Sequence, residues 1–439
     1  MWHDPTRFRR VCPLLVSTPE GWRCSVDAVD VRPFWGLAVR HFALGLLISY
    51  IVITAGLYGV LRYVGYHITP LATMWPPAWH QIHTAQEGVY AIRAARALNA
   101  GNLQSAVLAL ELVCDINPHN VPAGLALANL WQVSNQPALA DGMYLRLIDR
   151  NPEARAIITQ AWYHALLSRA DYPMIKELSV RMLSVHDGNE GVWLHALFFA
   201  SRQTKDVRLL KGLLAQPPAM PVWCLDLVRV EVALLEDRFR DVRLALTSPA
   251  VQPPSSYVAY YQIERLIMTG HYYEALAMLD AYGKRLNSDE ATFHRLRIFS
   301  ARGWSSLAES EFDRVLSRPL SPRVYTLICA YLIRQPNRAL LSRYFVHFMR
   351  AQLPLTPENY PYFAATYTAA AANGNWERAT EIEAMLKRLT GAEASTFQAL
   401  LDFFRWRDAK KRIELILPVL ALPTEVSYSL LERYQPIGK

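Results

Sequence analysis

Charged residues are scarce in this chain, and so are cysteines. Asp, Glu, Lys and Arg make up 19% of the 439 residues. That is below the share of about 25% in ordinary soluble domains, and with 52% apolar residues it excludes a disordered chain. The 5 cysteines are too few for a scaffold built from disulfides. Lysine is rare too: it supplies 8 of the 46 basic residues, so the net charge of +8 comes from arginine.

Catalytic and metal-binding motifs are also missing from the sequence. It has no glycine-rich phosphate loop, no nucleophile elbow and no His-Glu-x-x-His helix. His80, His83 and Glu87 would share one face of a helix, and we interpret them as a polar face beside the membrane rather than as a zinc site. We therefore expect no enzymatic activity, no cofactor and no metal ion.

One long apolar run is present. Residues 42–61 carry no charge, and Arg40 and Arg62 flank them. About 20 helical residues are needed to cross the apolar part of a bilayer, so we predict a transmembrane signal-anchor helix at 42–64. A buried core helix would rarely run this long without a charge, and no Ala-x-Ala site follows that would indicate a cleaved signal peptide. The residues assigned to the anchor are Phe42, Leu46, Ile51, Leu57 and Leu61.

Basic residues near the span predict its orientation. Arg23, Arg32 and Arg40 lie within about 20 residues before it, whereas only Arg62 lies that close after it. We therefore expect residues 1–41 to form a cytoplasmic arm. The larger C-terminal part would then be periplasmic, and the protein would be a single-pass protein of the inner membrane. Within the arm, a small hairpin or an unstructured segment both fit the prolines at positions 13, 19 and 33.

The rest of the chain carries a helical repeat. The segment AARALNAGNLQSAVLALELVCDINPHN, residues 94–120, has the pattern of two short amphipathic helices that are separated at Gly101 and end before Pro118. The next unit ends at Pro152, 34 residues later. Small residues recur at the matching positions Ala94 and Ala128. In these residues the chain resembles the tetratricopeptide repeat (TPR) family, whose period is 34 residues.

Extending this spacing predicts a turn between the two helices of each unit. Arg169 and Gln203 are placed by the spacing alone. The predicted turns fall at Gly101, Asn135, Arg169, Gln203, Asp237, Gly270, Gly303, Asn337, Gly374 and Asp408. The predicted fold is therefore all-α: a single N-terminal transmembrane helix followed by an α-solenoid of about ten TPR-like hairpins. The linker would span 65–86, the repeat array 87–411 and a pair of capping helices 412–439.

The resemblance also implies a binding surface. In TPR arrays the first helices of the hairpins line a concave groove, and Tyr, Trp and Arg dominate the matching positions here, as they do at protein-binding hot spots. Some of these side chains could instead pack between hairpins. The groove positions are Asn129, Gln132, Tyr163, Trp193, Tyr257, Tyr260, Glu264, Phe293, Arg297, Tyr331 and Arg334.

We interpret the chain as a membrane-anchored scaffold that binds other proteins, for instance in envelope assembly, secretion or export machinery. The alternative is a glycan-binding protein or an accessory to polysaccharide synthesis or export. A clustered row of exposed Trp and Tyr with carboxylates would favour the glycan, and scattered Tyr and Arg would favour peptides. Nucleic acid is not an expected partner, because the basic residues are interleaved with acidic ones. The lipid bilayer is also an expected partner, through the single transmembrane helix.

Overall fold

The computed structural model describes residues 15–19, 21–24, 35–185, 188–217, 220–247, 256–282, 284, 286–390, 395–406, 413 and 416–434. These residues are helical apart from one hairpin, so the all-helical class is confirmed for the described chain after residue 24. Strands β1 (Leu15–Thr18) and β2 (Gly21–Cys24) pair antiparallel, with Leu15 opposite Cys24. Of the two alternatives for the N-terminal arm, the described part therefore contains the hairpin.

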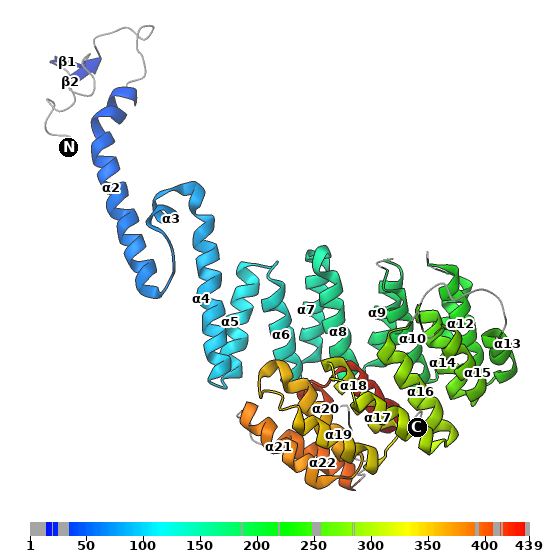
Figure 1. Cartoon of the computed structure of the whole chain (residues 1–439). Helices are drawn as coiled ribbons and strands as arrows, with labels where there is room; N and C mark the ends of the chain where they lie inside the picture. Colours follow the sequence, from blue (N-terminus) through cyan, green and yellow to red (C-terminus); the bar gives the residue numbers. More distant parts are fainter. Residues whose placement is uncertain are drawn as a thin grey trace. The chain divides into compact units, whose positions relative to one another are not determined.

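The chain divides into two compact units, which are described separately (Figure 1). The first comprises residues 1–131 and 138–154, and the second comprises 132–137 and 155–439. After the hairpin, the helices of the first unit are α2 (Trp35–Val64), α3 (Pro70–Met74), η1 (Pro76–Ala78), α4 (His80–Asn99), α5 (Leu103–Ile116), α6 (Val121–Val133), α7 (Pro137–Arg150) and η2 (Pro152–Ala154).

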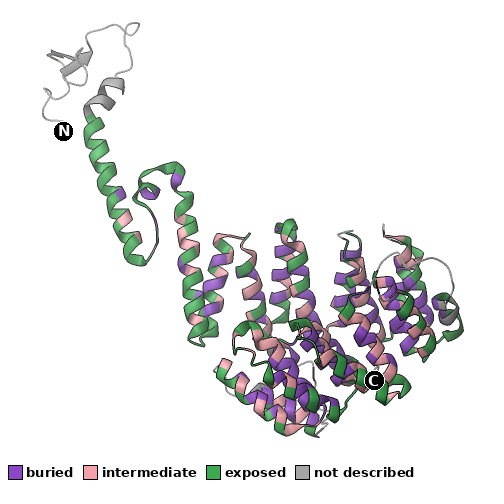
Figure 2. Cartoon of the chain, in the orientation of Figure 1, coloured by how far each residue is buried: buried purple, intermediate pink, exposed green. Residues whose placement is uncertain are grey.

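Helix α2 contains a segment long and apolar enough to cross a membrane. That segment is Phe42–Val64, with a mean hydropathy of 2.1. Its side chains are almost all exposed, as Figure 2 shows, and Leu46 is 64% exposed. Such an apolar surface is stable when lipid rather than water covers it. The segment predicted to span the membrane therefore lies within a single helix, and that helix begins before the apolar run, at Trp35.

The segment predicted as a linker, 65–86, contains α3, η1 and the first turns of α4. Helix α4 packs against α5. The Glu87 carboxylate of α4 accepts hydrogen bonds from the side-chain amides of Asn117, at 3.0 Å, and Asn120. Glu87 therefore fixes α4 to the turn between α5 and α6. It does not join His80 and His83 in a metal site.

The second unit begins with α8 and contains the remaining described helices. They are α8 (Arg155–Ser168), α9 (Tyr172–Leu183), α10 (Glu190–Thr204), α11 (Arg208–Ala215), α12 (Val222–Leu235), α13 (Phe239–Thr247), α14 (Ser256–Met268), α15 (Tyr272–Tyr282), α16 (Ser288–Arg302), α17 (Ser305–Leu316), α18 (Pro322–Arg334), α19 (Arg338–Arg350), η4 (Pro357–Asn359), α20 (Tyr360–Ala372), α21 (Trp376–Thr390), α22 (Ser395–Trp406), α23 (Leu417–Leu420) and α24 (Thr424–Tyr434).

Packing in the second unit follows the order of the chain. Consecutive helices pack in pairs, such as α14 with α15 and α16 with α17. Helices two places apart in the chain also pack against each other (Figure 1). These contacts join α10 to α12, and they join α14, α16, α18, α20 and α22 in one row. Helices α8, α10, α12, α14, α16, α18 and α20 are called the first-helix row below. Their buried side chains come from more than one face, because each packs on several neighbours.

Most of the predicted turns between helices are confirmed by the backbone. A residue with positive φ occurs at Gly101, Asn135, Asp237, Gly270, Gly303 and Gly374. Gly, Asn and Asp tolerate this left-handed conformation best, which is why the sequence marks these turns. At the two turns placed by spacing alone, the left-handed residues are Ala170 and Lys205 instead of Arg169 and Gln203. Asn337 has negative φ and caps α19. Asp408 lies outside the described residues.

The C-terminal helix does not extend the row. We predicted that 412–439 would cap the array after its last repeat, and yet α24 packs against α18 and α8, far earlier in the chain (Figure 1). Six consecutive residues of α24, from Val426 to Leu431, are buried. A helix buried around its circumference is enclosed by its neighbours rather than laid on a surface. The segment thus fills space along the first-helix row.

Candidate functional site

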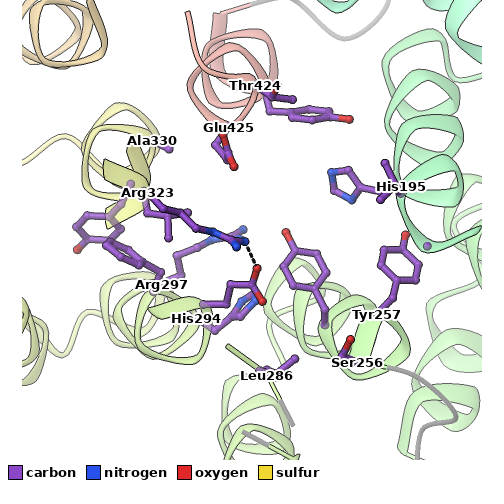
Figure 3. Close-up of a pocket in the computed structure, with 18 of the residues that line it drawn as sticks. His195, Ser256, Tyr257, Leu286, His294, Arg297, Arg323, Ala330, Thr424 and Glu425 are labelled. Carbon is purple, nitrogen blue, oxygen red and sulfur yellow. Dashed lines mark hydrogen bonds and ion pairs between the residues drawn. The ribbon is translucent and has the colours of Figure 1, made fainter. Parts of the chain in front are cut away.

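The main cavity of the second unit lies between the first-helix row and α24. Its volume is about 420 Å³, and α8, α10, α14, α16, α18 and α24 contribute its lining (Figure 3). On α16 the lining residues are Glu290, Phe293, His294 and Arg297. These positions are three or four residues apart, so they share one helix face. The same spacing brings several residues of α18 to the cavity.

Seven of the eleven predicted groove residues line this cavity. They are Tyr163, Tyr257, Tyr260, Phe293, Arg297, Tyr331 and Arg334. The repeat spacing therefore brings together side chains from four helices that are up to 171 residues apart in the sequence (334 minus 163).

The other four predicted residues lie elsewhere. Trp193 is buried and packs edge-on against Tyr163, with ring centroids 5.9 Å apart. Glu264 is buried behind the lining. Gln132 donates a hydrogen bond to the backbone oxygen of Ala165 at 3.2 Å. Asn129 is exposed on α6. Three of these four side chains therefore serve packing or internal hydrogen bonding.

Aromatic rings form one wall of the cavity. Tyr257 and Tyr260 stack with centroids 6.3 Å apart and planes 20° apart. Gly191 of α10 makes this arrangement possible, because a Cβ atom there would lie 2.7 Å from Cγ of Tyr257. Tyr428 of α24 closes the cavity from the other side and packs against Phe199 with centroids 4.4 Å apart.

The arginines of the cavity are each paired with a carboxylate. Arg297 pairs with Glu264, Arg323 with Glu290, and Arg334 with Glu432 through Nε and Oε2 at 2.8 Å. Nδ1 of His294 also lies 2.9 Å from Glu264. Burial raises the pKa of Glu264, but Arg297 and His294 outweigh it and hold the pKa well below its usual range. Glu264 is therefore ionised at neutral pH.

A second buried network lies behind the cavity, on α10, α12 and α14. The carboxylate of Glu231 is fully buried. It lies 3.1 Å from Nη1 of Arg202 and accepts a hydrogen bond from the Tyr261 hydroxyl at 2.7 Å. Nε of Arg265 lies 3.8 Å away. Each of these contacts joins helices two places apart, so the network fixes the spacing of the row.

Three polar groups at the cavity are left without partners. The hydroxyls of Tyr163 and Tyr257 are buried and have no hydrogen-bond partner among the described residues. Glu425 of α24 has no ion-pair partner there either, and Figure 3 shows its carboxylate directed into the cavity. Burial, with Arg202 and Arg265 nearby, lowers the pKa of His195 to about 4. Its imidazole is therefore neutral at pH 7.

Sequence reasoning missed the contributions of α24 and of two histidines. His195 and His294 are not among the predicted groove residues, yet both line the cavity. The helix spacing from His294 to Arg297 could have indicated the second of them. No repeat position could have indicated Glu425 and Tyr428, because α24 lies outside the 34-residue pattern.

Among the described residues, no group of three His, Cys, Asp or Glu side chains is placed to hold a metal ion. Compared with known protein families and with curated protein sequences, the chain matches neither a family nor an individual protein. The function must therefore be argued from the geometry of the chain itself.

Proposed function

We propose that this chain is a membrane-anchored TPR-like scaffold that binds partner proteins through its first-helix row. One observation carries the proposal: the row already holds a helix. It encloses the chain's own α24 along α18 and α8, with Tyr428 seated among aromatic rings. A row of helices that encloses another helix along its length offers the kind of contacts used in helix-in-groove recognition.

The repeat architecture is supported by contacts at a regular separation. Side-chain pairs between helices of the row recur about one period apart, as in Glu231 with Tyr261 at 30 residues and Glu264 with Arg297 at 33 residues. The left-handed turn residues recur at a similar interval. Stacked helical hairpins produce both features, because each repeat contacts its neighbours through equivalent positions. We therefore propose a solenoid of TPR-like hairpins.

The part of the row that α24 leaves open exposes aliphatic side chains. Ile157 and Val222 lie in the first turns of α8 and α12, are 62% and 72% exposed, and do not line the cavity. Exposed apolar side chains near the starts of helices in one row are typical of a protein contact surface. We assign partner binding to this side of the row.

The α2 anchor would confine the scaffold to a membrane surface. The α2 span would hold the repeats at a bilayer, where a second membrane protein is met at high effective concentration. The excess of arginines before the span supports a cytoplasmic N-terminus and periplasmic repeats. Envelope assembly, secretion or export machinery would supply such partners.

Purification of the tagged full-length protein in a mild detergent, followed by mass spectrometry, tests the proposal. The test variant carries Ile157→Asp and Val222→Asp. The matched control carries Leu307→Asp and Val346→Asp, two exposed aliphatic residues on the second helices α17 and α19. A stoichiometric protein that is lost only in the test variant supports the scaffold. Recovery of the protein alone, or equal capture by all three proteins, would contradict it.

A further inference from the structure

The cavity beneath α24 contains hydrogen-bonding capacity that the protein does not use. Tyr163 is 6% exposed, and its hydroxyl has no partner among the described residues. The buried hydroxyl of Tyr257 is likewise unpaired within the described chain. A buried hydroxyl without a partner costs about 1–3 kcal/mol, and for this reason such groups are rare in native proteins. Both residues line the cavity, and each hydroxyl oxygen exposes less than 1 Å² of surface. A ligand that both donates and accepts hydrogen bonds would satisfy both tyrosines once their rings turn toward it.

The charges of the cavity do not favour an anion. Arg297, Arg323 and Arg334 are each neutralised by a carboxylate. Glu425 adds one negative charge with no counter-ion among the described residues, and its carboxylate faces the cavity in Figure 3. A phosphate or a peptide carboxylate would meet this negative charge while the arginines are already engaged. A neutral ligand with hydroxyl donors would instead hydrogen-bond to Glu425.

The walls and the size indicate a ring-shaped ligand. Tyr257 and Tyr260 present two nearly parallel rings, and Phe293 and Tyr428 add further aromatic surface. The C–H faces of sugar rings pack on aromatic planes of this kind. The volume of about 420 Å³ lies in the range of about 300–1,000 Å³ that is usual for small-molecule sites with apolar walls and few polar groups. It accommodates a short saccharide and not a folded domain.

We infer that this cavity is a binding site for a neutral saccharide. Sugar hydroxyls bond to the carboxylate of Glu425 and to the neutral imidazole of His195, and the rings of Tyr163 and Tyr257 turn to bring their free hydroxyls against the sugar. The ring packs on the Tyr260 side of the aromatic wall. The inference does not rest on the proposed scaffold, since the cavity lies within the second unit and needs no protein partner. A scaffold with this site would recognise a glycan as well as a protein.

The test measures binding of neutral disaccharides by saturation-transfer NMR. The probes are chitobiose, cellobiose and maltose, each at millimolar concentration, and the protein is the full chain in nanodiscs. Glycoside detergents are avoided because their head groups would compete. At least one disaccharide is expected to bind. Choline and tartrate serve as cationic and anionic comparison ligands and are expected to bind more weakly.

Three variants link the binding to the cavity. Tyr257→Phe removes only the unpartnered hydroxyl, so the affinity for the disaccharide should fall about two- to tenfold while thermal stability is unchanged or higher. Glu425→Gln replaces the charged carboxylate acceptor with a neutral amide and should weaken disaccharide binding by a similar factor. Tyr273→Phe is the matched control: Tyr273 is 62% exposed on α15 and does not line the cavity, so both affinity and stability should stay as in wild type.

Two results would overturn the inference. One is that none of the three disaccharides binds, or that choline or tartrate binds more tightly. The other is that a disaccharide binds with the same affinity to the wild type, to Tyr257→Phe and to Glu425→Gln, because the sugar would then lie elsewhere. Neither result depends on whether a protein partner is captured, so the failure of this inference and the failure of the scaffold are distinguishable.

Discussion

The docking of α24 can be tested by truncating one side chain, Tyr428. This residue is 7% exposed and packs against Phe199, His195 and Tyr163, with centroids 4.4, 5.0 and 6.4 Å away. A buried aromatic ring covers about 150 Å² or more, which at about 25 cal/mol per Å² corresponds to about 4 kcal/mol. Truncation of such a ring to alanine usually costs about 3–5 kcal/mol. We expect Tyr428→Ala to destabilise the docked helix by about that amount.

Hydrogen exchange of the backbone amides measures this effect where it arises. In Tyr428→Ala, the amides of α24 should exchange faster than in wild type, by a factor that corresponds to several kcal/mol. The amides of α21 should change little, because that helix packs mainly on α20. Tyr428→Phe keeps the ring and should cost less than about 1 kcal/mol. Unchanged protection of α24 in Tyr428→Ala would refute the docking argument.

Three further perturbations test Glu231, His195 and Gly191 in the second unit. Glu231→Ala leaves buried arginines unpaired and should lower the free energy of unfolding by about 3–5 kcal/mol. The control is Glu309→Ala, at a side chain 42% exposed, which should change the free energy of unfolding by no more than about 1 kcal/mol. Urea unfolding of the two variants measures both changes, and equal losses would contradict the reasoning. His195 has its pKa lowered from 6.5 to about 4, so the unfolded chain binds more protons between these values. Stability should fall by up to about 3 kcal/mol as the pH drops from 6.5 to 4, and an unchanged pH profile in His195→Gln would argue against this cause. Gly191→Ala places a Cβ 2.7 Å from a ring atom and should lower the melting temperature at a cost of about 1–3 kcal/mol. Gly142→Ala meets no atom within 4 Å and should leave it unchanged or raise it.

The repeat pattern in the sequence predicted local geometry well. Gly270, Gly303 and Gly374 mark turns because the left-handed backbone there excludes most other residues, and this constraint is visible in a single sequence. At Ala170 and Lys205 no such residue type marks the turn, and there the prediction is one or two residues off. The apolar segment of α2 could be predicted for a similar reason, since its length and lack of charge suffice.

The assembly of the cavity could be predicted only in part. The spacing of the first helices placed Tyr257, Tyr260 and Arg297 among the predicted groove residues, and all three line the cavity. Equivalent positions of stacked repeats face the same side, which is why the spacing could predict this. The docking of α24 depends on how Tyr428 and Glu432 fit side chains that lie about 100 residues or more away in the sequence. No periodicity encodes such a tertiary fit.

Photo-crosslinking in the native host tests the central claim, partner binding by the first-helix row, most directly. A photoreactive phenylalanine analogue replaces Ile157 or Val222, which are 62% and 72% exposed on the row. The control position is Ser342, exposed on α19. We predict that both row positions form a covalent adduct with the same second protein and that Ser342 does not. Absence of any adduct from the row, or the same adduct from all three positions, would contradict the account.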